Sequence, residues 1–417
     1  MNTQSLEPLS IGILIILSIA LYYQVFLLLV FLGRKPSPLT QKLSSASLPS
    51  VTIVIPCYNE ESTIANCIAS VLALTYPQEK LNIVVVDDGS QDGSIEALRN
   101  STHQERVLVI QKENGGKYTA LNIAIPNITT DIVGTLDADS FVHPEALIRM
   151  VEKFADPRVM AVTPALKIHN TKGFFGRLQQ TEYTLAIFIR NVLASLDAIH
   201  VTPGPFSLFR KEVFNKIGLY KKAHDAEDLE FALRMQLHHM KIANAHNAYV
   251  YTVSPATIVS LFRQRLRWTL GFLHNMIDYL PSLFRLKYGN LGMFVLPSSL
   301  LALGASVLMI WHLGRGVVSI VDQQLLKFSA VGASLPSLSL PSSELFFYIN
   351  TSPMIFLVLT AMALTVALIL IGKNLSGNEP LRMGILYFLF LYGFIALTWY
   401  LSAAVRTLFM RKTIHWK

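Results

Sequence analysis

Long apolar segments divide this chain into a membrane part and a globular part. The segments without a charged residue are 9–33, 291–311, 353–372 and 383–405. A helix of about 20 apolar residues is long enough to cross a hydrocarbon core of ~30 Å. We therefore predict an N-terminal membrane helix within residues 1–34 and about three membrane helices within 291–417, where 312–350 is ambiguous.

The first apolar segment is expected to stay in the membrane. A cleaved signal peptide carries basic residues before its apolar stretch, whereas here Arg34, Lys35 and Lys42 follow it. Basic residues favour the cytoplasmic side of a membrane. We therefore expect a multi-pass protein of the cell membrane, with the region after Arg34 in the cytoplasm.

The C-terminus is harder to place. Four crossings would return it to the outside, where it would carry Arg406, Arg411, Lys412 and Lys417. This arrangement opposes the tendency of basic residues to stay inside. We therefore favour a further crossing or a re-entrant piece within residues 316–350.

Residues 35–256 have the hydropathy of an ordinary globular domain. Short stretches rich in Val and Ile are predicted strands at 51–56, 81–87, 106–111, 131–137 and 158–163. Helix-length stretches separate them at 60–74, 117–125 and 144–155. Uniformly apolar strands that alternate with helices indicate a mostly parallel sheet covered on both faces. The sequence thus predicts a doubly wound, Rossmann-like α/β domain, whose ligands bind beyond the carboxyl ends of the strands.

Two further segments combine apolar residues at helical spacing with polar ones. They are residues 173–196 and 258–284, and the second belongs to a region, 257–290, that leads into the next membrane segment. We predict amphipathic helices on the membrane face. The alternative, that they are core helices of the globular domain, stays open.

The composition limits the classes of binding partner that we expect for this chain. The formal net charge is +8, which fits a domain facing anionic lipid headgroups. No basic-aromatic nucleic-acid module is present, so nucleic acid is not an expected partner. Cys57 and Cys67 are too few for a disulfide framework and lack metal-ligand spacing.

Acidic residues follow the predicted strands. Glu60 comes after the first, Asp87 and Asp88 end the second, and Asp137 and Asp139 end the fourth. Two carboxylates at a strand end can hold a hard divalent cation together with substrate phosphates, and the cation would neutralise a diphosphate leaving group. Each of these motifs could instead have a purely structural role, because Asp and Ser also favour turns and helix caps.

Three other groups of residues could bind substrate or take part in the reaction, and each also has a purely structural interpretation. The loop 114–117 leads into a helix and suits either phosphate binding or a simple turn. Glu227 and Asp228 precede an apolar helix, whose N-terminal dipole also favours acids. Gln264, Arg267 and Trp268 share one helix face at i, i+3 and i+4, as residues that contact a membrane would.

The order of these motifs decides between the alternatives. They are Val54-Ile55-Pro56-Cys57-Tyr58-Asn59-Glu60, Val86-Asp87-Asp88-Gly89-Ser90, Gly116-Lys117-x-x-Ala120-Leu121-Asn122, Asp137-Ala138-Asp139, Glu227-Asp228 and Gln264-x-x-Arg267-Trp268. From residue 51 to about 273, the chain resembles the membrane-bound family 2 glycosyltransferases. The resemblance is to the branch of the poly-N-acetylglucosamine, cellulose, chitin and hyaluronan synthases, and it implies a GT-A-like domain.

This resemblance implies an inverting, metal-dependent transfer from a UDP-sugar. Tyr58, Glu60 and Asp88 would contact uridine, with Asp87 as the weaker candidate, and Lys117 would lie near the nucleotide.

The same resemblance assigns the reacting groups. Asp137 and Asp139 would belong to the site of Mg²⁺ or Mn²⁺, with Asp139 as the stronger direct ligand. Asp228 matches the general base, a carboxylate that takes the proton of the acceptor hydroxyl. Glu227 precedes it, and Ala226 stands where the family more often has Thr, so a hydroxyl contact is lost.

The acceptor side is assigned in the same way. Gln264, Arg267 and Trp268 would bind the diphosphate and the acceptor sugar. Gly204, in the segment 202–206, would line the acceptor site, although Pro205 departs from the family pattern.

Three functions are weighed. The first is a processive synthase that extends a β-linked polysaccharide and exports it. The second is a single transfer to a membrane lipid, because four spans are few for a polymer channel. The third, an inactive sugar-nucleotide sensor or scaffold, is disfavoured because every expected carboxylate is present. The donor sugar, the linkage, homo-oligomerisation and accessory subunits stay open.

Overall fold

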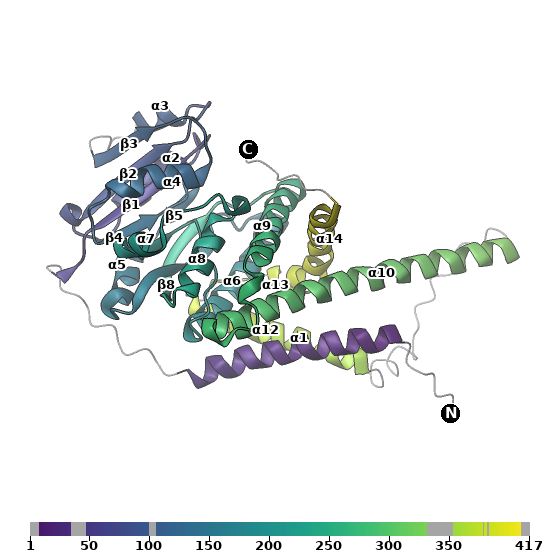
Figure 1. The fold of residues 1–417 in the computed structure, drawn as a ribbon. Helices are drawn as coiled ribbons and strands as arrows, with labels where there is room; N and C mark the ends of the chain where they lie inside the picture. Colours follow the sequence, from purple (N-terminus) through teal and green to yellow (C-terminus); the bar gives the residue numbers. More distant parts are fainter. Residues whose placement is uncertain are drawn as a thin grey trace.

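The computed structural model describes residues 8–34, 47–99, 106–331, 353–377, 379–381 and 383–409. In this part of the chain, an α/β domain is joined to a group of long apolar helices (Figure 1). The described residues thus form a globular part and a group of apolar helices, whereas the predicted domain bounds and the membrane location of these helices stay predictions.

The described part of the globular domain contains one mixed sheet, in the order β3-β2-β1-β4-β7-β6-β8-β5. Its strands are β1 (Val51–Cys57), β2 (Leu81–Asp87), β3 (Val107–Gln111), β4 (Ile132–Thr135), β5 (Ser140–Val142), β6 (Val159–Ile168), β7 (Ser207–Arg210) and β8 (Lys241–Thr252). The first four neighbours in this order are parallel, whereas β7 is antiparallel to both β4 and β6. β8 is parallel to β6, and β5 is antiparallel to β8.

The five predicted strands are present, but β5, β7 and β8 were not predicted. β5 and β7 are only three and four residues long. β8 mixes polar and apolar residues, with a burial pattern that changes from residue to residue. It lacks the continuous apolar stretch that marks a strand buried on both faces, and this explains why the antiparallel half of the sheet was missed.

Helices cover both faces of the sheet. They are α2 (Ile64–Leu72), α3 (Ser94–Arg99), α4 (Lys117–Ala124), α5 (Ala146–Val151), α6 (Gly173–Ser195), α7 (Lys211–Ile217) and α8 (Glu227–Leu237). Alternate residues of β1 serve two cores: Ile53 and Ile55 pack with α2 and α5, whereas Val54 packs with α4 and α8. This alternation follows from the pleat of a strand.

The remaining described helices include the apolar ones. They are α1 (Pro8–Gly33), α9 (Ile258–Asp278), α10 (Leu296–Val331), α12 (Pro353–Leu375), α13 (Gly384–Tyr387) and α14 (Gly393–Phe409), with π-helical turns at Leu291–Val295 and Phe388–Tyr392. Four helical stretches are long and apolar enough to cross a membrane: Ile11–Gly33, Leu291–Ala330, Pro353–Leu375 and Gly384–Thr407. They coincide with the predicted apolar segments.

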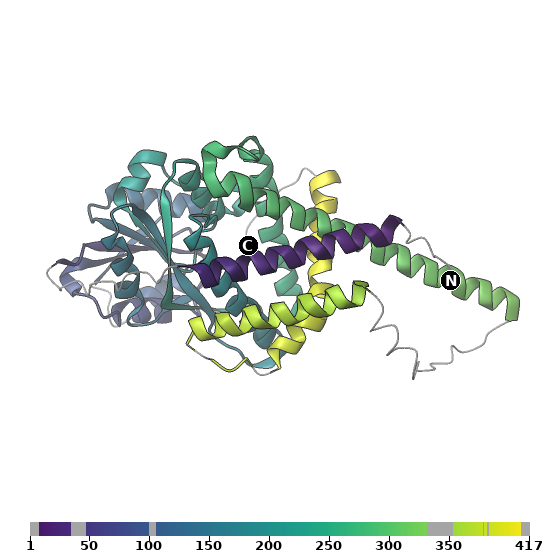
Figure 2. The same ribbon diagram turned by 90° about the horizontal axis from the view of Figure 1, so that it is seen from below.

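The ambiguous segment 312–350 is only partly described. Residues 312–331 continue α10 as one straight helix, which extends well beyond α1 and α12 (Figure 2). The described part, 316–331, therefore contains no separate re-entrant piece. Residues 332–350, where the rest of the predicted piece would fall, lie outside the described residues.

The apolar helices do not all run in one direction. α1, α10 and α12 run roughly along one another, whereas α14 runs across them in both views (Figures 1 and 2). α14 packs along α9, and α6 packs between β6 and β8 on one side and α1, α12 and α13 on the other. The two predicted amphipathic helices thus form the junction between the sheet and the apolar helices.

Candidate active site

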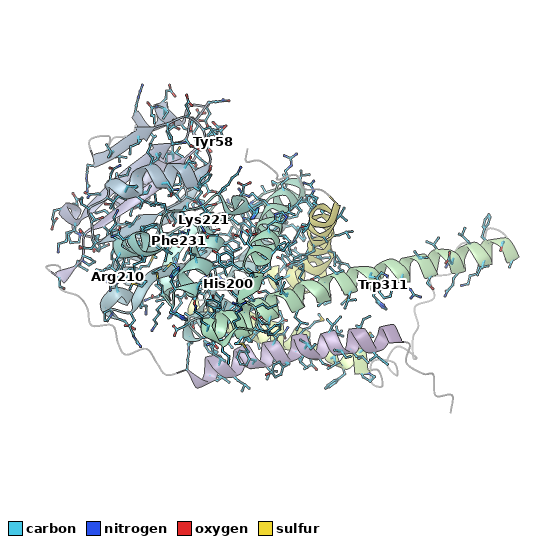
Figure 3. All side chains as sticks on the ribbon, viewed as in Figure 1. Tyr58, His200, Arg210, Lys221, Phe231 and Trp311 are labelled. Carbon is cyan, nitrogen blue, oxygen red and sulfur yellow. The ribbon has the colours of Figure 1, made fainter. Side chains whose placement is uncertain are left out.

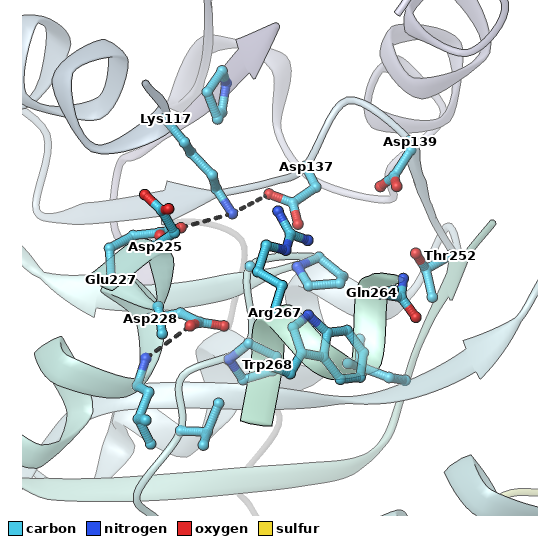
Figure 4. A pocket seen from close by; sticks show the side chains of 18 of the residues that line it. Lys117, Asp137, Asp139, Asp225, Glu227, Asp228, Thr252, Gln264, Arg267 and Trp268 are labelled. Carbon is cyan, nitrogen blue, oxygen red and sulfur yellow. Dashed lines mark hydrogen bonds and ion pairs between the residues drawn. The ribbon is translucent and has the colours of Figure 1, made fainter. Parts of the chain in front are cut away.

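A cavity of about 450 Å³ opens at the carboxyl ends of β1 and β4 and is closed by α6, α8 and α9 (Figure 4). The predicted site residues that line it are Tyr58, Glu60, Asp88, Lys117, Asp137, Asp139, Gly204, Glu227, Asp228, Gln264, Arg267 and Trp268. Asp87 is the exception. The position agrees with the rule that ligands of such sheets bind at the carboxyl ends of the strands.

Asp87 and Asp88 organise the backbone around the cavity. Asp87 is buried and accepts the N–H of Ser90, so it stabilises the turn after β2. Asp88 accepts the N–H groups of Gly115 and Gly116 at 3.1 and 2.8 Å and pairs with Lys112. Phosphate binding was one of two alternatives for the loop 114–117, and in the structure these two glycine N–H groups donate to the Asp88 carboxylate.

Two residues follow β1 at the cavity wall. Tyr58 lies near the strand end (Figure 3), where an aromatic ring can cover a nucleobase. The Glu60 carboxylate accepts a hydrogen bond from the Thr63 hydroxyl, and burial raises the pKa of Glu60 above its usual value.

Asp137 and Asp139 bring two carboxylates to one end of the cavity. Burial, and then the charges of Asp137 and Glu60, raise the pKa of Asp139 to about 7. Lys117 Nζ lies 2.6 Å from Asp137 Oδ1 and 3.1 Å from Glu227 Oε1, and so bridges the two acids (Figure 4). The raised pKa of Asp139 thus follows first from burial and then from the neighbouring carboxylates.

This carboxylate pair fits a divalent cation. Among the described residues, no group of three or more His, Cys, Asp or Glu side chains could hold a metal ion by itself. Mg²⁺ commonly binds through one or two carboxylates plus phosphate oxygens and water. Asp137 and Asp139 could therefore hold Mg²⁺ or Mn²⁺ when a diphosphate supplies the other ligands.

Residue 204 must be glycine, because any side chain there would collide with the Lys117–Asp137 ion pair. A Cβ placed on Gly204 would lie 2.6 Å from Asp137 Oδ2 and would also meet the ammonium group of Lys117. The backbone carbonyl of Gly204 accepts the N–H of Asp137 at 3.2 Å. The turn between α6 and β7 thus supports the pair from behind.

Glu227 and Asp228 begin α8 and point into the cavity. Burial opposes the charge of Glu227, but Lys117, a backbone hydrogen bond and Arg267 together keep the pKa of Glu227 below its usual value. Burial, followed by the negative charge of Glu227, raises the pKa of Asp228 to about 6. Asp228 Oδ1 also accepts the N–H of Leu229 at 2.8 Å. Asp228 therefore lies at the start of a helix, and its place in the cavity leaves the predicted role of a proton acceptor open to it.

A strained turn presents these two acids. Ala223, His224 and Asp225 have φ values of 46°, 55° and 59°, a left-handed conformation that non-glycine residues seldom adopt. α9 holds it in place. Asn275 Nδ2 donates to the carbonyl of Ala223 at 3.0 Å, and His224 Nε2 lies 2.9 Å from Asp278 Oδ2. The 222–226 turn is therefore fixed by the same helix that carries Gln264, Arg267 and Trp268.

Gln264, Arg267 and Trp268 form the α9 wall of the cavity (Figure 4). The Trp268 side chain is 41% exposed, so much of its indole is available to a ligand. The Oε1 atom of Gln264 is buried and has no hydrogen-bond partner among the described residues. Such an acceptor suits a ligand hydroxyl, because unpaired buried polar atoms are costly.

Several residues that line the cavity were not predicted. Glu182, Tyr183 and Arg190 project from α6, and Arg265 lies within the Gln264–Trp268 motif itself. The polar run 179–182 inside an otherwise apolar segment was the available signal for Glu182. Arg190 has no comparable local signal, because its place in the cavity depends on how α6 packs.

Comparison with known proteins supplies independent information. Residues 52–218 match the family model described as glycosyl transferase family 2. The poly-beta-1,6-N-acetyl-D-glucosamine synthase of Staphylococcus aureus is 32% identical over 243 residues, which cover 58% of this chain and 57% of that protein. The synthase of the same name from Staphylococcus epidermidis is 29% identical over 273 residues, 64% of this chain and 65% of that protein. The match thus spans less than two thirds of these relatives.

One solved structure matches nearly the whole chain. It is a mannosyltransferase from Pyrobaculum calidifontis in complex with GDP-Man and Mn²⁺. The TM-score is 0.62 at 20% identity, and the match covers 96% of this chain and 99% of the other. At this identity the likeness concerns the fold, and it confirms the GT-A-like domain with its attached apolar helices.

Proposed function

Because this chain carries a glycosyltransferase family 2 domain, we propose that it transfers a sugar from a UDP-sugar to a growing β-linked polysaccharide at the cytoplasmic membrane face. The relatives' name, poly-beta-1,6-N-acetyl-D-glucosamine synthase, supports a polysaccharide product. The reaction is inverting and uses Mg²⁺ or Mn²⁺.

One observation carries this proposal: a single cavity contains two candidate metal ligands, a half-buried candidate base and an exposed indole. Tyr58 and Glu60 lie at the uridine end, and Asp137 and Asp139 follow at the diphosphate. Asp228 lies further along the cavity, next to α9. Donor, reacting centre and acceptor can therefore be bound in sequence.

Asp228 acts as the general base. Its carboxylate takes the proton of the acceptor hydroxyl while that oxygen bonds to the anomeric carbon. The bond from the anomeric carbon to the diphosphate oxygen breaks with its electron pair on UDP, so attack comes from the opposite face and the configuration inverts. A pKa of about 6 leaves Asp228 ionised near neutral pH while keeping it more basic than an exposed carboxylate.

The leaving diphosphate needs positive charge. A divalent cation on Asp137 and Asp139 would neutralise part of it. Lys117 is paired with Asp137 and Glu227, so its ammonium group would add positive charge beside the diphosphate. Arg267 offers a guanidinium from α9, whose geometry suits phosphate oxygens.

The acceptor sugar fits against α9. The exposed face of Trp268 can stack on a sugar ring, and Gln264 offers its unpaired carbonyl oxygen to a hydroxyl. Both lie close to the apolar helices through which a polymer would leave.

The test is incubation of the purified protein in lipid with Mg²⁺ or Mn²⁺ and a panel of radiolabelled UDP-sugars, followed by separation of products by size. Label in long chains that a specific glycanase degrades is the expected result and identifies the donor. Absence of transfer from every UDP-sugar would refute the proposal.

A second candidate is a single transfer to a membrane lipid that bears a phosphate. Arg190 favours it, because this half-buried cation lines the cavity and has no ion-pair partner among the described residues. A phosphate on the acceptor would supply the missing charge. Label only in a small product that organic solvent extracts would support this candidate over polymer synthesis.

A further inference from the structure

Three polar side chains from three separate elements meet beside the cavity. Glu182 belongs to α6, Arg265 to α9, and Tyr392 to the π-helical turn before α14. Arg265 Nη2 donates to Glu182 Oε2 at 2.7 Å, and the Tyr392 hydroxyl donates to Glu182 Oε1 at 2.9 Å. Both carboxylate oxygens of Glu182 are therefore engaged, and we call these three residues the Glu182 cluster.

The cluster is largely removed from solvent. Arg265 is 5% exposed, and a guanidinium this deeply buried requires a counter-charge. Glu182 is the carboxylate that supplies it. Burial lowers the pKa of Arg265, but Glu182 and the neighbouring tyrosines together raise this pKa above its usual value. The ion pair is thus a directional bond between α6 and α9 in a region of low dielectric.

Arg265 connects the Glu182 cluster to Gln264 and Trp268, where the proposed acceptor would bind; we call these two residues the acceptor wall. Its guanidinium carbon lies 4.3 Å from the centre of the Trp268 ring, within the range of a cation–π contact. Gln264 is the preceding residue and lines the same cavity. Rotation of α9 about its axis would therefore break the Arg265–Glu182 bond and move Gln264 and Trp268 together.

α9 also packs against α14 through apolar contacts, in addition to the hydrogen bonds of the Glu182 cluster. Leu266 and Leu273 pack against Ala396, Trp399 and Ala403 in an apolar cluster that the ring of Tyr392 also contacts. Apolar packing of this kind holds two helices together but tolerates small rotations better than a hydrogen-bonded ion pair does. The polar contacts therefore set the orientation of α9 rather than its attachment.

We propose that Glu182 is a positioning residue that holds Arg265 and Tyr392 at once and thereby places Gln264 and Trp268 for the acceptor. The C-terminal helices contribute to acceptor binding through Tyr392, although they do not line the reacting centre. This inference rests on the proposed glycosyl transfer for its kinetic test.

The experiment compares Glu182→Gln with Glu379→Gln in the full-length protein. Glu379 forms the matched control, because it also joins the domain to the C-terminal helices, through an ion pair with Lys167 at 2.7 Å, yet neither partner lines the cavity. We expect Glu182→Gln to raise KM for the acceptor about 10-fold while KM for the donor changes less than about twofold. Glu379→Gln should leave both KM values within about twofold.

Hydrogen–deuterium exchange of residues 258–278 gives a readout that needs no activity. Faster exchange in Glu182→Gln, but not in Glu379→Gln, is expected. If the wild-type protein transfers no sugar, the proposed function fails, whereas the exchange result still decides whether Glu182 orders α9. Equal acceptor KM values and equal exchange in the two variants would overturn the positioning role.

A second variant covers the case in which Glu182→Gln does not fold. Tyr392→Phe removes one hydroxyl and leaves the ion pair intact. A rise in acceptor KM of about threefold at unchanged donor KM is expected. An unchanged acceptor KM in Tyr392→Phe would refute the coupling of the C-terminal helices to the acceptor wall.

Discussion

Replacement of Gly271 by Ala tests whether α9 positions the catalytic acids. Gly271 lies on α9 against the 222–226 turn, which leads directly into Glu227 and Asp228. A Cβ on residue 271 would lie 2.6 Å from the Cβ of Ala226 and 3.3 Å from the carbonyl oxygen of His224. Because carbon atoms normally pack at about 3.5–4.0 Å, α9 and the turn must separate by roughly 1 Å.

The effect on stability should be small. Overpacking of this kind costs about 1–3 kcal/mol, but Ala in place of Gly favours a helix interior by about 1 kcal/mol. The net change is therefore about 0–2 kcal/mol, and a thermal scan of the purified protein should show Tm lowered by roughly 5 °C or less.

The effect on catalysis should be large. A misplacement of about 1 Å at a reacting group can cost about 100-fold in rate, and the displaced turn carries Asp228. We expect kcat of Gly271→Ala to fall about 100-fold, with binding of UDP, measured by calorimetry, changed less than about threefold. The measurement is the rate of sugar transfer in lipid at saturating donor and acceptor.

Gly304→Ala is the matched control, because α10 has open space around Gly304 and no atom lies within 4 Å of the added Cβ. Its kcat should stay within about twofold of wild type. Full kcat in Gly271→Ala would refute the argument that α9 sets the place of Asp228. An equal loss in Gly304→Ala would show that any added methyl group disturbs the enzyme.

Three further predictions concern the reacting groups. Asp228→Asn should lower kcat by about 10²–10⁴-fold without loss of UDP binding, since a general base contributes that much; full activity in a steady-state assay would contradict the assignment. Since burial and Glu227 raise the pKa of Asp228 to about 6 in the free protein, and only the carboxylate accepts a proton, kcat/KM should fall as pH drops through about 6, about tenfold per unit below it; a flat profile of kcat/KM from pH 5 to 8 would exclude this base. Asp139→Asn should raise the Mg²⁺ or Mn²⁺ concentration needed for half-maximal rate by about 10-fold or more; an unchanged metal titration would remove Asp139 from the metal site.

Local sequence determined the elements that carry the site. Uniform apolar residues in Val51–Cys57 and Leu81–Asp87 predicted buried parallel strands, and the acids that follow them had to lie at one edge of the sheet. The spacing of Gln264, Arg267 and Trp268 placed them on one face of a helix. These features depend on backbone periodicity alone, so a single sequence reveals them.

Some motif residues make backbone contacts that their motifs did not reveal. Asp87 matched the motif but stabilises a turn, and the N–H groups of Gly115 and Gly116 bind Asp88. A residue type at a motif position does not say whether its polar atoms face a ligand or the backbone, because that choice depends on the partner the fold brings within 3 Å.

Only the tertiary structure decided how the acceptor wall is held. Glu182 and Tyr392 are 210 positions apart in the chain yet share a hydrogen bond, and the left-handed turn before Glu227 exists because Asn275 of α9 holds it. The sequence by itself thus determined the strands, the helices and the edge at which the acids gather, since these follow from short-range periodicity. The ion pairs, the strained turn and the direction of α14 across the other apolar helices follow from long-range packing, which no local pattern encodes.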